Sequence, residues 1–149
     1  MGRKTGGGTS NPVTGWKDAE AFKTTNNLTY GLSRCHLIAS ILGGRGNDAL
    51  TRTNLVPCWQ SGMNTGTPSM RTFESKAQNM IQGPLANFGA NNAIFYQVTP
   101  VYKDANSTIP VGVTMNANIE RANGTTEELF PNVYVTNTLK NTGLYNLGN

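Results

Sequence analysis

The single histidine, His36, is the residue in this sequence best suited to acid–base chemistry near neutral pH. A neutral imidazole has a pKa of about 6.5 and can take a proton from water. Arg34 lies two residues earlier, so on an extended strand both side chains would share one face. A guanidinium can bind two oxygens of one phosphate group. A lone histidine is more often structural or simply exposed, so the pair needs support from the rest of the chain.

Further polar side chains with candidate roles follow downstream: Asn54, Asn64, Arg71 and Glu74. Taken singly, each has an ordinary structural interpretation. Asn64 in "NTG" is typical of a turn, and Glu74 on a helix surface would normally be solvated. One histidine and two cysteines, with no CxxC pair, cannot supply the usual four-ligand zinc site. The sequence therefore argues against a zinc-stapled site.

The clearest predicted helix is "TPSMRTFESKAQNMIQG", residues 67–83. Thr67 is predicted to cap it, and Pro68 suits the first helical position. Arg71 and Glu74 fall together on a polar face. The apolar residues at helical spacing form the opposite face: Met70, Phe73, Ala77, Met80 and Ile81. This amphipathic pattern predicts that the helix packs against a core with Glu74 on its polar side.

Shorter elements are predicted before this helix. Residues 18–23 read as a short helix anchored by Trp16 and Phe22. A turn and a short strand precede His36, and an apolar run after it ends at a Gly-Gly pair, a strong helix and strand breaker. "NLVPCW", residues 54–59, is a further short strand. These segments would position the candidate residues.

The last third of the sequence is predicted to be β. "AIFYQVTPVY" is rich in β-branched and aromatic residues, and residues 109–120 alternate apolar and polar side chains. "KDANS" and "ANGTT" read as turns, and the segment around Val133 and Val135 as another strand. We therefore predict an α+β fold, an antiparallel sheet with helices in the first half of the chain. Residues 1–12 are predicted to be a flexible tail and residues 13–149 one domain.

Composition narrows the classes of partner. The 149 residues carry a formal net charge of +4, which favours polyanions only weakly. The sequence contains no run of about 18 apolar residues, the length that predicts a membrane-spanning helix. We therefore expect no membrane partner. No charged-then-apolar leader opens the sequence. We expect a secreted or extracellularly delivered protein whose export signal lies elsewhere.

The run "SRCHLIASILGGRGNDALTRTNLVPCWQSGMNTGTPSMRTFE" resembles the active-site segment of the DNA/RNA non-specific endonucleases. That family has an Asp-Arg-Gly-His motif, a Gly-Gly turn, an Asn-Leu/Ile-Val/Thr-Pro strand, an Asn ligand and a helix carrying a Glu. Ser33 stands where the family usually has Asp, and Cys35 where it has Gly. "YQVTPVYKDANSTIPVGVTMNA" and "NVYVTNT" are similar to the paired strands of streptococcal and streptomycete secreted members.

The resemblance implies a ββα-metal unit and a mechanism. His36 would be the general base that activates water, a role typically worth about 10²–10⁴-fold in rate. Asn64 would bind one Mg²⁺ or Mn²⁺, which would offset charge on the pentacovalent phosphorus and assist the leaving oxygen. Mg²⁺ keeps several waters, so one or two protein oxygens suffice. Glu74 would hold the metal-bound waters.

The remaining site residues follow from the same resemblance. Arg34 and Arg71 would contact the phosphate, and Asn54 would support the site. Cys35 and Cys58 would lie on neighbouring segments of the ββα unit, and we expect a disulfide between them. The predicted catalytic set is thus His36, Arg34, Glu74, Asn54 and Arg71, with Asn64 as metal ligand.

The resemblance implies a nuclease that cuts DNA, RNA or both without sequence preference and leaves a 5′-phosphate. Two other classes remain open at this point. One is a nucleic-acid-binding module that has lost catalysis, and the other is a secreted β-rich glycan-binding or adhesion module. The setting is also open between a secreted scavenging enzyme and the toxin domain of a longer delivered protein, which would have an immunity protein as partner.

Overall fold

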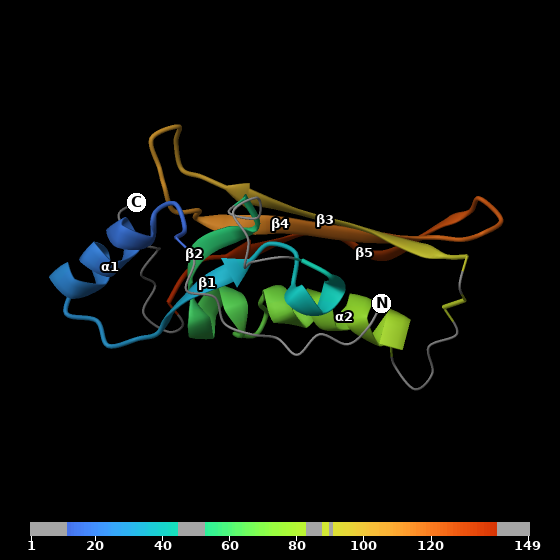
Figure 1. The fold of residues 1–149 in the computed structure, drawn as a ribbon, viewed down its shortest axis with the longest axis horizontal. Helices are drawn as coiled ribbons and strands as arrows, with labels where there is room; N and C mark the ends of the chain where they lie inside the picture. The colour runs from blue at the N-terminus through green and yellow to red at the C-terminus, as the bar shows by residue number, and fades with distance from the viewer. Residues whose placement is uncertain (1–11, 45–52, 83–87, 90, 140–149) are drawn as a thin grey trace.

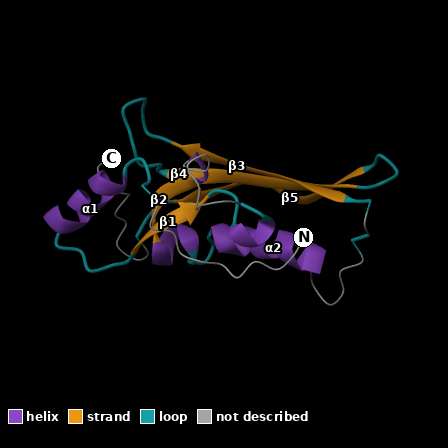
Figure 2. Cartoon of the chain, viewed as in Figure 1, coloured by secondary structure: helices purple, strands orange, loops and turns teal. Residues whose placement is uncertain are grey.

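A computed structural model describes residues 12–44, 53–82, 88–89 and 91–139. The predicted tail lies outside these residues apart from Pro12. The elements in chain order are α1 (Trp16–Thr25), β1 (Leu32–His36), η1 (Ser40–Leu42), β2 (Leu55–Trp59), η3 (Gln60–Asn64), α2 (Met70–Gln82), β3 (Ala93–Val101), β4 (Gly112–Glu120) and β5 (Thr126–Thr136). The predicted α+β class is confirmed, with the helices before the long strands (Figures 1 and 2). No helix in the described ranges is long and apolar enough to span a membrane.

The strands form two antiparallel sheets. β1 and β2 pair with each other, with Leu32 opposite Trp59 and His36 opposite Leu55. β3, β4 and β5 pair in chain order as a second sheet. In Figure 1 this long sheet runs across the molecule, with α2 along one face, the β1–β2 pair near one end, and α1 beyond that end.

β4 is the central strand of the long sheet, and the alternation in its sequence gives it one buried face. Val113, Met115, Ala117 and Ile119 are buried, whereas the intervening side chains are only partly buried. The strand begins at Gly112, later than the pattern from residue 109 predicted. Pro110 has no N–H to give to a ladder, which accounts for the late start.

α2 also begins later than predicted. The helix starts at Met70, so Thr67 does not cap it and Pro68 is not its first residue. The Ser69 N–H donates to Thr72 Oγ1 (3.0 Å), which organises the first turn instead. Ser69 and Met70 are both buried, so the chain enters the core at this point and Thr67 and Pro68 remain exposed outside it.

The main core lies between the long sheet and the layer formed by β1, β2 and α2. Phe130 of β5 is its aromatic centre, with ring centroids 5.3 Å from Phe73 and 6.1 Å from Tyr96. A disulfide joins Cys35 of β1 to Cys58 of β2, with Cα atoms 5.9 Å apart, and this confirms the expected pairing. Both half-cystines are buried, so the disulfide is part of the core.

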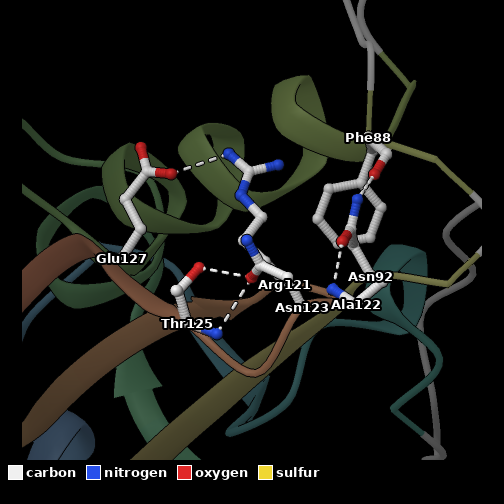
Figure 3. Close-up of polar contacts among 7 residues, drawn as sticks. All are labelled: Phe88, Asn92, Arg121, Ala122, Asn123, Thr125 and Glu127. Carbon is white, nitrogen blue, oxygen red and sulfur yellow. Dashed lines mark hydrogen bonds and ion pairs between the residues drawn. The ribbon is translucent and has the colours of Figure 1, made fainter.

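The turn between β4 and β5 is set by local hydrogen bonds (Figure 3). Asn123 Oδ1 accepts from the N–H (3.0 Å) and the hydroxyl (2.6 Å) of Thr125. Arg121 and Glu127 form an ion pair across the turn at 2.7 Å. Asn92, from the segment before β3, accepts a backbone N–H of the same turn (2.8 Å). The predicted "ANGTT" turn is confirmed.

Asn137 joins the two sheets through a buried side-chain amide. Its Oδ1 accepts the Trp59 N–H (3.1 Å), and its Nδ2 donates to the carbonyls of Pro57 (3.1 Å) and Pro110 (2.9 Å). Its backbone N–H donates to Val111 O (2.8 Å). These bonds connect β2 to the segments beside β4 and β5, so the placement of the β1–β2 pair depends on them.

We expect Asn137→Ala to lower the free energy of unfolding by on the order of 3 kcal/mol. The substitution would leave the buried Trp59 N–H and the carbonyls of Pro57 and Pro110 without this hydrogen-bond partner. Urea denaturation monitored by tryptophan fluorescence measures the change. Asn132→Ala, at an exposed position of β5, is the matched control and should be near neutral. Equal stability of the two variants would contradict a linking role for Asn137.

Candidate active site

One hollow of about 320 Å³ collects five of the six predicted site residues. Arg34 and His36 come from β1, Asn64 from the end of η3, and Arg71 and Glu74 from α2. These elements are separate in sequence and meet because β1 and β2 pair and η3 leads directly from β2 toward α2. Five of the residues predicted from the sequence and the resemblance therefore line the same hollow.

His36 ends β1 and is half-buried. Burial lowers the pKa of its imidazole below 6.5, because desolvation disfavours the charged ring. The histidine is therefore neutral at pH 7 and able to accept a proton. The peptide after it is held by a bond from the Leu37 N–H to Asn54 O (2.8 Å).

Asn54 directly precedes β2 and is not among the residues that line the hollow. Its Oδ1 accepts the Ile38 N–H (2.8 Å) and its Nδ2 donates to Ile38 O (3.0 Å), so the amide clamps the backbone just past the histidine. Gly44 packs closely against the Ile38 carbonyl, and a side chain at position 44 would clash with that oxygen. The structure thus gives Asn54 contacts suited to supporting the site and leaves no side-chain atom of it in the hollow.

Glu74 is buried, with 6% of its surface exposed. The ordinary interpretation of its place on the polar face, a solvated helix carboxylate, therefore does not hold. Burial raises the pKa of Glu74 to about 7, and the nearby Arg71 guanidinium opposes the rise. Helical periodicity shows which residues share a face but not which neighbours cover that face. Here the hollow and the core enclose it.

The two arginines differ in how they are held. The Arg34 guanidinium lies 3.9 Å from the centre of a Trp16 ring, a cation–π contact that brings α1 to the site. Arg71 is exposed and donates to Gln78 Oε1 at 3.4 Å. Sequence analysis named Trp16 only as an anchor of α1. The pairing with Arg34 depends on tertiary packing, which no local pattern signals.

Asn64 is oriented by a residue that sequence analysis did not single out. Its Nδ2 donates to Gln60 Oε1 (2.8 Å), and the Ser33 hydroxyl donates to the same oxygen. Gln60 stands four residues before Asn64 in η3, a spacing that brings the two side chains together only once η3 has formed. The amide oxygen of Asn64 is the end left for other contacts.

The donor set suits a hard cation. Within the described ranges, no three His, Cys, Asp or Glu side chains gather in a way that could hold a metal. Among the side chains that line the hollow, Asn64 offers an amide oxygen and Glu74 a carboxylate, beside the hydroxyls of Ser40 and Thr65. Mg²⁺ takes oxygen ligands, keeps several waters and needs one or two protein oxygens, so Asn64 and Glu74 fit it.

Comparison with known families gives one finding. A family model described as DNA/RNA non-specific endonuclease matches residues 10–121, which is more than half of the chain. The matched range runs from before α1 to just past β4 and includes every predicted site residue. No curated protein and no solved structure matches the chain.

The burial of Glu74 predicts a pH-dependent stability. A carboxyl whose pKa is raised from 4.5 to about 7 on folding costs stability as pH rises through that window. We therefore expect Glu74→Gln to stabilise the metal-free protein by on the order of 2 kcal/mol at pH 8, with little effect at pH 4. Thermal or urea unfolding in EDTA at a series of pH values measures this. Glu128→Gln, at an exposed carboxylate on β5, is the control. A pH-independent difference from wild type would contradict the assigned cause.

Proposed function

Because this chain belongs to the DNA/RNA non-specific endonuclease family and is therefore a nuclease, we propose that it hydrolyses DNA, RNA or both without sequence preference, with a divalent metal and His36 as general base. The observation that carries this proposal is the convergence of five predicted site residues, from three separate elements, on one hollow. A base, two guanidinium groups and two oxygen donors in one space are what phosphodiester hydrolysis needs.

The chain's own residues divide the work as follows. His36, kept neutral by partial burial, takes the proton from the attacking water. Arg34, its guanidinium held against Trp16, binds phosphate oxygens, and the exposed Arg71 can bind another part of the same phosphate. Asn54 keeps the backbone after His36 fixed, so the imidazole does not drift from the reacting phosphate.

Asn64 would hold Mg²⁺ or Mn²⁺ through its amide oxygen, and Glu74 would hold the waters of that ion. When bound, the ion supplies positive charge that stabilises the phosphate and the departing oxygen. Glu74 resists ionisation while no metal ion lies beside it, because burial penalises the carboxylate more than Arg71 stabilises it. A cation beside it would lower its pKa, so metal binding and ionisation of Glu74 should be coupled.

Recognition in this proposal goes through phosphate and sugar, which carry no sequence information. The net charge of +4 and the two arginines of the hollow favour a polyanion. Following the resemblance, cleavage would leave a 5′-phosphate. The partners are therefore DNA and RNA.

We also propose that the protein works outside the cytoplasm in which it is made. The disulfide between Cys35 and Cys58 supports this, because such bonds persist mainly in oxidising compartments. Both secretion as a scavenging enzyme and delivery as a toxin domain with an immunity protein fit this setting. Co-expression that requires a neighbouring inhibitor protein for viability would favour the second.

We expect His36→Ala to reduce cleavage of supercoiled plasmid and of total RNA by about 10²–10⁴-fold, because the base that activates water is lost. His36→Asn keeps a polar side chain but no base and should be equally impaired. Asn132→Ala is the active control, and excess EDTA should stop the wild type. Near-wild-type cleavage by both His36 variants would overturn the mechanism. A wild type inactive with Mg²⁺ or Mn²⁺ would favour a binding module.

The lowered pKa of His36 fixes the direction of the pH–rate profile. The base acts when neutral, so kcat/KM should rise with pH along a limb whose midpoint lies below pH 6.5. Measuring kcat/KM against pH at several Mg²⁺ concentrations distinguishes the titration of His36 from that of Glu74. A limb due to Glu74 would move to lower pH as Mg²⁺ increases, whereas a limb due to His36 would stay in place. A metal-independent limb above pH 7 would contradict the assignment to His36.

A further inference from the structure

Gln60 connects two parts of the site through one oxygen. Its Oε1 accepts from Asn64 Nδ2 (2.8 Å) and from the Ser33 hydroxyl. The Gln60 N–H donates to Gly31 O (3.0 Å), and its carbonyl accepts from the N–H (3.0 Å) and hydroxyl (2.8 Å) of Thr65. The backbone of Gln60 is thus fixed on both sides, and its side chain reaches from η3 to β1.

The hydrogen bond to Gln60 determines which end of the Asn64 amide remains available. An asparagine side chain has an acceptor end and a donor end, and only the oxygen can bind a cation. With Nδ2 engaged by Gln60 Oε1, the oxygen is the free end. In the described part of the chain this is the one hydrogen bond of the Asn64 side chain. A flipped amide would present N–H groups to the cation and repel it.

We propose that Gln60 is a positioning residue that selects the metal-binding orientation of Asn64, with Ser33 as its anchor on β1. This inference rests on the proposed function, in which Asn64 binds the metal. Ser33 donates to Oε1 and so favours the orientation of the Gln60 amide in which oxygen faces both donors. In the opposite orientation, Gln60 Nε2 would face Asn64 and donate a hydrogen bond to the Asn64 amide oxygen, which could then not bind the metal.

The sequence context gives this arrangement a reason. Ser33 stands where the resembled family usually has an aspartate. A serine hydroxyl reaches less far than a carboxylate and carries no charge. In this chain the neutral Ser33–Gln60–Asn64 chain of hydrogen bonds connects the start of β1 to the site instead.

The test is the affinity for Mn²⁺ itself, measured by calorimetry or by the electron paramagnetic resonance of free Mn²⁺. Gln60→Met keeps the length of the side chain and removes the acceptor. We expect it to weaken Mn²⁺ binding by about 10–100-fold, the usual effect of losing a group that orients a metal ligand. Gln60→Glu keeps an acceptor and should bind Mn²⁺ at least as tightly as wild type. In cleavage, Gln60→Met should raise the Mn²⁺ concentration needed for half-maximal rate more than it lowers the rate at saturation.

A double-mutant comparison separates positioning from a general structural effect. Asn64→Asp makes both ends of the side chain acceptors, so its orientation no longer matters. In the Asn64→Asp background, Gln60→Met should therefore change Mn²⁺ affinity far less than it does with asparagine at position 64. An equal loss in both backgrounds would mean that Gln60 acts by stabilising the fold, and would overturn the proposal.

Asn64→Ala distinguishes failure of this inference from failure of the proposed function. If Asn64→Ala weakens Mn²⁺ binding and Gln60→Met does not, the positioning role is wrong and the metal role of Asn64 stands. If Asn64→Ala leaves Mn²⁺ affinity unchanged, Asn64 is not a ligand, and both proposals fall. Circular dichroism and thermal unfolding of each variant confirm that the compared proteins are folded.

Discussion

A single buried amide, that of Asn137, joins β2 to the long sheet and so helps to fix the position of the candidate site. A polar group removed from water must find partners, and this one is satisfied only where β2 and the Pro110 segment converge on it. The Cys35–Cys58 disulfide then ties β1 to β2. The positions of the β1 side chains, including His36, therefore depend on how β2 packs against the long sheet.

Burial shapes the chemistry of the hollow through two groups of opposite charge type. Desolvation lowers the pKa of His36 and raises that of Glu74, and in both cases it favours the neutral form. For His36 this is the state that a general base requires. For Glu74 it means that ionisation needs a neighbouring positive charge, which Arg71 supplies only in part. A divalent cation held by Asn64 would supply the rest.

Supporting contacts hold the candidate site residues in place. Trp16 from α1 lies against the Arg34 guanidinium, Gln60 binds the Asn64 amide, and Asn54 clamps the backbone past His36. None of these contacts joins residues that are adjacent in sequence. Such supports reduce the freedom of the reacting groups before substrate arrives, which is where positioning contributes to rate.

The sequence by itself determined the elements and the candidates. Alternation around Val113 and Met115 fixed the buried face of β4, and the spacing from His36 to Glu74, with the family resemblance, identified five of the residues that line the hollow. Tertiary structure alone decided that Glu74 is buried, that α2 starts at Met70, that Ser33 meets Gln60, and that Trp16 meets Arg34. The reason is physical: periodicity and turn chemistry act between near neighbours in the chain, whereas burial and side-chain pairing depend on which distant segments cover a given face.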